Sequence, residues 1–296
     1  METVFKNDLF KGQRILITGG GTGLGFQMAQ TLAALGAELH LCGRRPEVVK
    51  EAAEQLQETY GTPAFSHALD IRNYDAIDEM MSKIWEDHGP LNGLVNNAAG
   101  NFISRSHTLS PNGFNAISDI VLRGTFYITQ AAGKRWIEHN LPGSIVSIVV
   151  TWVWTGSPFV VPSAMSKAGV DAMTKSLAVE WGGHNIRLNA IAPGVIPTEG
   201  ASRRLRPKNT QSTGMIARNP MKTLGTGQDI GELAAFLLGT GSRWINGQTI
   251  ALDGGDWLAN GAYFTEYLDW TEEDWQTARQ AIDAQNKADR QGRADQ

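Results

Sequence analysis

The chain has 296 residues, a length that suits one large α/β domain or two small ones. Its net charge of -4 gives no electrostatic reason to expect a nucleic-acid partner. The single cysteine, Cys42, has no second cysteine with which to form a disulfide, which is typical of intracellular proteins. The sequence shows no apolar run of bilayer-spanning length and no secretory leader, so we expect a cytoplasmic protein that makes no use of membranes.

Short apolar runs alternate with helical patterns along the chain. The expected elements in chain order are strands at 14–20, 37–43, 64–70 and 93–100 separated by helices at 24–36, 46–61 and 74–89, then a helical region at 111–140, a strand at 143–150, a helix within 158–181 and strands at 186–193 and 247–255. Strands that alternate with helices form right-handed βαβ units and a mostly parallel sheet. The sequence therefore predicts an α/β chain with a three-layer, doubly wound, Rossmann-like fold.

This prediction includes a seven-stranded parallel sheet in the order 3-2-1-4-5-6-7. Because we find no internal repeat and no break in composition, we expect a single domain over residues 1–296 with a polar C-terminal tail from about 270. We also expect a homo-oligomer, specifically a homotetramer. The aromatic residues Trp270 and Trp275 in the tail suit a subunit contact, although they suit packing on their own domain equally well.

A glycine-rich turn, TGGGTGLG at 18–25, follows the first expected strand and opens the first expected helix. Gly19, Gly23 and Gly25 let the backbone turn sharply and approach a pyrophosphate, while the helix N-terminus offers free N–H groups to its charge. The alternative is an ordinary glycine-rich turn between a strand and a helix. The motifs that follow along the chain favour the dinucleotide site.

The end of the second expected strand bears on the choice of dinucleotide. An acidic residue there would accept a hydrogen bond from the ribose 2′-hydroxyl of NAD, but the chain has Gly43 followed by Arg44 and Arg45. Guanidinium groups suit a 2′-phosphate through their charge and fork geometry. The sequence thus favours NADPH, against the alternative that both arginines are simply solvated.

Several separated motifs together resemble the short-chain dehydrogenase/reductase family. They are TGGGTGLG, Asp70 after the third strand, NNAAG at 96–100, Lys167 in its helix and APGVIPT at 192–198. More narrowly, NNAAGNFIS, DIVLRGT, TGSPFVVPSAMSKAG, SRWINGQTIALDGG and WTEEDWQ resemble the 2,4-dienoyl-CoA reductase branch. The resemblance implies NADPH-dependent reduction of a 2,4-dienoyl-CoA to an enoyl-CoA.

The resemblance also implies a set of site residues. Those expected at the cofactor are Gly19, Thr22, Gly23, Leu24, Gly25, Arg44, Asp70, Asn97, Ala98, Gly100, Lys167, Pro193, Gly194, Ile196 and Thr198, and those expected at the substrate are Phe102, Ser104, Trp152 and Arg204. Some have structural alternatives, since Gly100 and Gly194 also suit turns and Asp70 also suits a helix cap. Lys167 is different, because a lysine on a small-residue, apolar helix face needs an anionic or hydroxyl partner.

The expected catalytic residues depart from the pattern of ketone-reducing members. Those members use Asn, Ser, Tyr and Lys, whereas the matching positions here hold Val121, Val150 or Thr151, Ser163 and Lys167. Because a serine hydroxyl is a poor proton donor in place of tyrosine, ordinary alcohol and ketone interconversion is disfavoured. The dienoyl-CoA reductase branch itself carries a serine at the Ser163 position.

The mitochondrial type of that branch uses a tyrosine and an asparagine, and these positions hold Trp152 and Arg123 here. In one hypothesis, Arg123 donates to the enolate oxygen, Thr151 or Ser163 assists, and water supplies the proton. In another, Trp152 fills the pocket and the chain binds NADPH without turnover. A third is a reductase of another carbonyl substrate of the 3-oxoacyl type. Arg123 also has the alternative of pairing with Asp119 one helical turn earlier.

A basic segment, SRRLRPK at 202–208, follows the sixth expected strand. Its cations, among them Arg204, suit the phosphates of an acyl-CoA substrate, although a solvated loop accounts equally well for the charge pattern. No two of the six histidines have the sequence spacing of metal ligands, so the sequence predicts no metal site.

Overall fold

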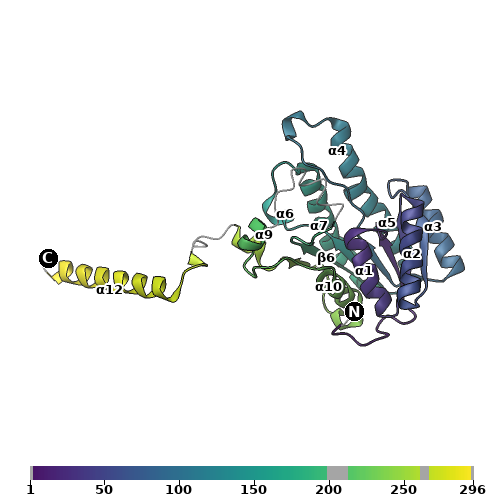
Figure 1. Ribbon diagram of the computed structural model, residues 1–296. Coiled ribbons are helices and arrows are strands. Elements are labelled where there is room, and N and C mark those ends of the chain that lie inside the picture. The colour runs from purple at the N-terminus through teal and green to yellow at the C-terminus, as the bar shows by residue number, and fades with distance from the viewer. Residues whose placement is uncertain (1–2, 199–212, 261–266, 295–296) are drawn as a thin grey trace. The chain divides into compact units, whose positions relative to one another are not determined.

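The structure is a computed structural model of the chain, and it describes residues 3–198, 213–260 and 267–294 (Figure 1). Its contacts divide the chain into two compact units, Met1–Asp256 and Trp257–Gln296. The first unit contains the whole sheet and all the described candidate site residues, and the second contains the C-terminal tail.

Seven strands form one sheet, and every neighbouring pair is parallel. The strands are β1 (Arg14–Thr18), β2 (Glu38–Gly43), β3 (Ala64–Ala68), β4 (Gly93–Asn96), β5 (Gly143–Ile148), β6 (Ile186–Pro193) and β7 (Thr249–Leu252). Their order is β3-β2-β1-β4-β5-β6-β7, which confirms the predicted fold class and sheet order. Every residue of β4 and β5 is buried, as expected for central strands that are covered on both faces.

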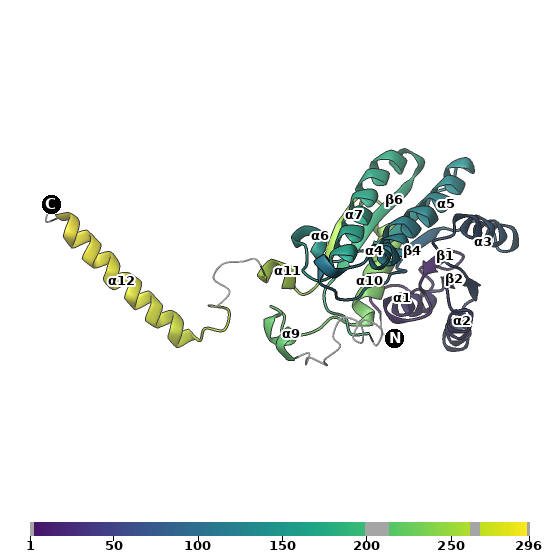
Figure 2. The same ribbon diagram turned by 90° about the horizontal axis from the view of Figure 1, so that it is seen from above.

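Helices connect these strands. In the first unit they are α1 (Gly23–Ala34), α2 (Pro46–Tyr60), α3 (Tyr74–Asp87), η1 (Ser106–Thr108), α4 (Pro111–Ser118), η2 (Asp119–Gly124), α5 (Thr125–Glu138), α6 (Trp152–Thr155), α7 (Val161–Trp181), η3 (Gly182–His184), α9 (Thr213–Arg218), α10 (Gly227–Leu238) and η4 (Thr240–Ser242), and α11 (Asp256–Ala259) begins at its last residue. Helices α1, α2 and α10 cover one face of the sheet, and α3, α5 and α7 cover the other (Figure 2). This gives the three layers that the sequence predicted.

The predicted helical region at 111–140 consists of three successive pieces, α4, η2 and α5. The middle piece, η2, is a π-helix, a rare form that often marks functional sites. It packs closely on α7, because a Cβ placed on Gly169 would lie 2.7 Å from Leu122 Cδ1. The π-helix therefore fixes how the residues around Arg123 are presented beside α7.

The second unit contains helix α12 (Glu272–Ala294). Thr271 and Asp274 begin this helix with reciprocal hydrogen bonds, in which the Thr271 N–H donates to the Asp274 carboxylate (2.8 Å) and the Asp274 N–H donates to Thr271 Oγ1 (3.3 Å). The Trp270 ring lies 4.3 Å from that of Tyr267 and 4.9 Å from that of Trp275. These aromatic residues thus pack on one another within their own unit.

Along the described ranges of the chain, we find no helix that combines the length and the apolar character needed to cross a bilayer.

Candidate active site

The glycine turn, residues 18–25, runs from the last residue of β1 into the first turn of α1. Gly19 and Gly23 have φ angles of +65° and +57°, which favour glycine. The side chain of Thr22, at the N-cap of α1, makes no capping hydrogen bond to the helix N-terminus. A helix N-terminus without a side-chain cap keeps donor N–H groups for an anion, so this turn fits the pyrophosphate of a dinucleotide.

Asn97 and Thr18 hold the glycine turn in place. The Asn97 side-chain amide donates to the carbonyl oxygens of Thr18 (3.0 Å) and Gly19 (3.1 Å). Thr18 Oγ1 in turn accepts the backbone N–H groups of Asn97 (3.0 Å) and Ala98 (2.9 Å). Asn97, expected at the cofactor, thus acts on the turn through its amide, and Thr18 is a supporting residue that the sequence analysis did not single out.

The opposite end of the expected cofactor site contains Arg44 and Asp70. Arg44 is exposed directly after β2. The Asp70 carboxylate accepts two hydrogen bonds from Arg72 Nε, at 2.9 and 3.0 Å. These hydrogen bonds, helped by the charge of Arg44, hold the pKa of Asp70 below its usual value. Asp70 is therefore an ionised carboxylate that is already engaged by a neighbouring arginine.

Lys167 lies inside the protein on α7 and is only 6% exposed. Its ammonium group donates to the carbonyl oxygen of Ile148, the last residue of β5. Burial lowers the pKa of Lys167 to about 8. Ser163, one helical turn earlier, is buried as well, so both side chains lie on the covered face of α7 near the carboxyl end of β5.

Two loops meet beside the first turn of α7. The Ser104 N–H donates to the Phe159 carbonyl oxygen at 2.8 Å, which joins the loop after β4 to the segment that leads into α7. Phe102, on the first of these loops, is half-buried. Thr151 and Trp152 begin the short helix α6, which packs on α7, and both are half-buried. The expected substrate residues of the described chain thus lie on segments adjoining α7.

The segment after β6 returns to the glycine turn. A Cβ on Gly23 would lie 3.8 Å from the nearest Thr198 atoms, so Thr198 faces that turn across a narrow space. Ile196 is buried, and Pro193 ends β6. A Cβ on Gly194 would lie 2.6 Å from Asp253 Cβ, so close packing of the ends of β6 and β7 accounts for this glycine.

Gly100 and Leu24 have less specific surroundings. A Cβ on Gly100 would meet Ile117 at 3.6 Å, an ordinary van der Waals contact, so its surroundings do not demand glycine. Leu24 packs against the core on the α1 face of the sheet. Their role at the cofactor stays a prediction.

Arg123 forms the ion pair that the sequence analysis considered as an alternative. Its Nη2 lies 3.3 Å from Asp119 Oδ1 on the π-helix, and the arginine side chain is 50% exposed. Val121, at the position of the family's asparagine, is fully buried. The basic segment at 202–208, including Arg204, lies outside the described residues.

A family model described as enoyl-(acyl carrier protein) reductase matches residues 19–256. A Caenorhabditis elegans protein named as a probable 2,4-dienoyl-CoA reductase is 39% identical over 287 residues, which cover 94% of this chain and 92% of that protein. A Bacillus subtilis protein named as a probable 2,4-dienoyl-CoA reductase is 40% identical over 245 residues, covering 82% of this chain and 96% of that protein.

Solved structures show the same likeness. The crystal structure of a short-chain dehydrogenase from Bacillus anthracis is 41% identical with a TM-score of 0.78, and the match covers 84% of this chain and 98% of that one. An Agrobacterium tumefaciens structure named for 2-deoxy-D-gluconate 3-dehydrogenase, with bound NADP, is 31% identical with a TM-score of 0.77, covering 86% of this chain and all of that one.

The sheet, the glycine turn and the buried lysine define a nicotinamide-dependent oxidoreductase built on a Rossmann-like fold. The chain belongs to the short-chain dehydrogenase/reductase family, with members of its 2,4-dienoyl-CoA reductase branch among its similar relatives.

Proposed function

We propose that this protein is an NADPH-dependent reductase of an unsaturated acyl-CoA, of the 2,4-dienoyl-CoA reductase type. The observation that carries the proposal is the pair of Lys167 and Ser163, buried on α7 beside the carboxyl end of β5, with no tyrosine at the position of Ser163. Reduction of a conjugated thioester needs a donor to the developing oxyanion and a proton delivered to carbon. This reaction fits the pair better than ketone reduction, in which an alkoxide must be protonated by a stronger acid than serine.

In this proposal, different residues of the chain bind the cofactor and stabilise the reacting thioester. The glycine turn holds the pyrophosphate, Lys167 holds the nicotinamide ribose, and the segment 193–198 covers the nicotinamide. NADPH, when bound, would supply the hydride that reduces the far carbon of the conjugated thioester. Arg123 donates to the thioester oxygen as charge develops there, with Ser163 or Thr151 as a second donor, and water supplies the proton.

The ion pair of Arg123 is compatible with this role. A half-exposed pair with Asp119, four residues earlier on the helix, contributes only about 0.3–0.5 kcal/mol. Because an oxyanion donor contributes roughly 3 kcal/mol in a transition state, a substrate oxygen competes successfully for the guanidinium group. The pair with Asp119 therefore leaves Arg123 available to a bound thioester.

Arg123→Ala is expected to lower kcat for a medium-chain 2,4-dienoyl-CoA by about a hundredfold to a thousandfold, because it removes the main oxyanion donor. The measurement is NADPH oxidation followed by absorbance. Asp119→Asn is the matched control, since it breaks the same ion pair but keeps the arginine, and it should retain wild-type turnover.

Two results would count against this role. If Arg123→Ala and Asp119→Asn behave alike, Arg123 has only the structural role of an exposed ion pair. If the wild-type protein binds NADPH but turns over no dienoyl or enoyl thioester, the second hypothesis, a catalytically silent NADPH-binding protein, takes the place of the first. Reduction of a 3-oxoacyl compound would favour the third hypothesis, a reductase of another carbonyl substrate.

Arg44→Ser is expected to lower kcat/KM with NADPH by about tenfold to a hundredfold and to leave kcat/KM with NADH nearly unchanged. The reason is that Arg44 is the exposed cation at the end of β2 that suits the 2′-phosphate, and NADH has no such group. The bound NADP in the Agrobacterium tumefaciens structure supports this preference. Arg243→Ser, which removes an exposed arginine after η4, serves as the control, and an equal loss with both cofactors would contradict the assignment.

The homotetramer, the cytoplasmic location and the assignment of residues 1–296 to one domain stay predictions. So does the CoA-binding role of the segment at 202–208. We propose the acyl-CoA thioester itself as the small-molecule partner on the basis of the named relatives.

A further inference from the structure

At the amino end of strand β2 lies a cluster of one glutamate and three histidines. Glu38 and His40 are the first and third residues of β2, so their side chains point to the same face of the sheet. His88, at the C-cap of α3, and His67, on the edge strand β3, complete the cluster. The expected cofactor residues follow the carboxyl ends of the strands, so this cluster is a separate location.

Three nitrogen and oxygen atoms of the cluster converge at one point. Glu38 Oε1 lies 3.2 Å from His40 Nε2 and 3.6 Å from His88 Nδ1. One ligand atom from each of these three residues lies within 4.8 Å of the others. Ligands of a tetrahedral zinc ion, at about 2.0–2.1 Å from the metal, are separated from one another by about 3.3 Å. The two distances from Glu38 Oε1 are close to this separation, and the third is no longer than 4.8 Å.

We propose that Glu38, His40 and His88 bind a divalent transition-metal ion, Zn²⁺, with a fourth position open to water. A site with two histidines and one carboxylate is a well-established zinc ligand set. His40 is fully buried, whereas the Glu38 and His88 side chains are 22% and 25% exposed, so an ion can enter from the solvent side.

The surroundings of His40 support this assignment. Its second nitrogen, Nδ1, lies 3.0 Å from His67 Nε2, and a metal-binding histidine commonly donates its other N–H to an acceptor in this way. His67 is therefore a positioning residue for His40.

Arg14 is the competitor at this site, because its Nε lies 3.3 Å from Glu38 Oε1. The same oxygen, Oε1, also faces both histidines, so binding of the ion through Oε1 requires the carboxylate to turn and to pair with Arg14 through its second oxygen. In that arrangement the guanidinium orients the ligand from outside the coordination sphere.

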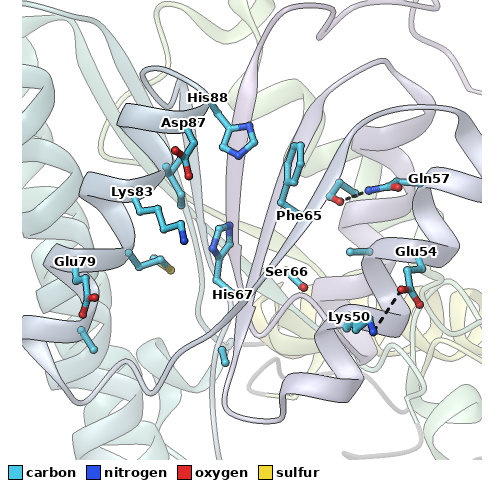
Figure 3. Close-up of a pocket in the computed structure, with 16 residues that line it drawn as sticks. Lys50, Glu54, Gln57, Phe65, Ser66, His67, Glu79, Lys83, Asp87 and His88 are labelled. Carbon is cyan, nitrogen blue, oxygen red and sulfur yellow. Dashed lines mark hydrogen bonds and ion pairs between the residues drawn. The ribbon is translucent and has the colours of Figure 1, made fainter.

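The site adjoins an open groove of about 750 Å³ that is lined by α2, β3 and α3. Figure 3 shows His67 and His88 among its lining side chains, together with Phe65, whose ring centroid lies 4.1 Å from that of His88. A metal ion here would join the C-terminus of α3 to β2 and stabilise this outer edge of the sheet. It would take no part in the reduction.

The test is calorimetric titration of the full-length, chelator-treated protein with Zn²⁺, together with thermal unfolding. We expect one Zn²⁺ per chain and a rise in Tm on binding. His88→Gln removes a partly exposed ligand and should lower the affinity by at least a hundredfold. His67→Leu removes only a positioning residue and should lower it by about 10–100-fold.

His184→Gln, which changes an exposed histidine after α7, is the matched control and should bind like the wild type. NADPH affinity, measured on every variant, checks that the fold is intact and does not depend on the metal. The proposal is overturned if the wild type binds no stoichiometric Zn²⁺, if His88→Gln keeps wild-type affinity, or if His184→Gln loses affinity equally. Dienoyl-CoA turnover is measured separately, so either proposal can fail alone.

Discussion

Lys167→Met is expected to raise the thermal stability of the ligand-free protein at pH 7 while it lowers reductase activity at least a hundredfold. The activity falls because Lys167 is the group proposed to hold the nicotinamide ribose. The stability rises because the wild-type protein buries the Lys167 ammonium group between α7 and the end of β5. The Ile148 carbonyl oxygen is its acceptor. The same feature thus serves function and opposes folding.

The pKa of Lys167 sets the size and sign of this effect. Burial lowers this pKa from 10.5 to about 8, which corresponds to about 3 kcal/mol against folding. The hydrogen bond lost with methionine has a charged donor and offsets about 2 kcal/mol, which leaves a gain of about 1 kcal/mol. For a protein of 296 residues, that gain raises Tm by roughly 2 °C.

The gain should depend on pH in a defined direction. Below pH 8 the lysine is protonated in both the folded and the unfolded states, so the full cost of burying the charge is present. Between pH 8 and 10.5 the folded state has lost the proton and the unfolded state has kept it, so wild-type stability rises with pH. The difference in Tm between the variant and the wild type should therefore narrow across this window.

Lys175→Met is the matched control for Lys167→Met. Lys175 lies on the same helix, is 52% exposed and pairs with Asp171, so its replacement should leave turnover unchanged and give no gain in stability. A Lys167→Met protein with unchanged or lower Tm at pH 7 would show that the ammonium group is not buried as described. Retained activity would remove Lys167 from the proposed ribose site.

The fold could be predicted from the sequence because each strand and its following helix carry their own signals. The apolar run 143–150 and the proline and glycine that bound helix 46–61 are local features, and parallel βαβ connections leave few arrangements for the sheet. The π-helix η2 was not predicted, since nothing in DIVLRGT distinguishes it from an α-helix. Packing of Leu122 on Gly169 is a tertiary contact that periodicity does not reveal.

Helix α12 was missed for a different reason. The sequence after 270 indicated only a polar tail, although Thr271 and Asp274 have the spacing of a capping box. A helix with a polar composition gives little apolar periodicity, so the capping residues were the available signal. Reading them would have predicted where the helix begins.

The candidate site was predicted in part. Motifs identified the glycine turn and Lys167, because their chemistry depends on residue type and position within a strand–turn–helix unit. The hydrogen bonds from Arg72 to the Asp70 carboxylate depend on side-chain conformations and were not predicted. The histidine cluster was not predicted because sequence spacing does not show that Glu38 and His40 meet His88 in the folded protein.

Gly25→Ala is expected to lower the affinity for NADPH at least a hundredfold and to lower the free energy of unfolding by about 1–3 kcal/mol. A Cβ at position 25 would lie 2.4 Å from the Gly19 carbonyl oxygen and 2.4 Å from Asn97 Nδ2. Neither atom is the end of a free side chain, because Asn97 is bonded to the backbone of the turn. The added methyl group must therefore displace the turn that is proposed to hold the pyrophosphate.

NADPH titration followed by fluorescence, together with thermal unfolding, measures both effects of Gly25→Ala. Gly183→Ala is the control, because a Cβ at Gly183 would have no atom within 4 Å and this exposed glycine lies in η3, after α7. The control should bind NADPH like the wild type. Wild-type affinity in Gly25→Ala would mean that the turn tolerates displacement, and the pyrophosphate would then have to be held elsewhere. Loss of affinity with little change in Tm would instead confine the effect of the methyl group to the binding geometry of the turn.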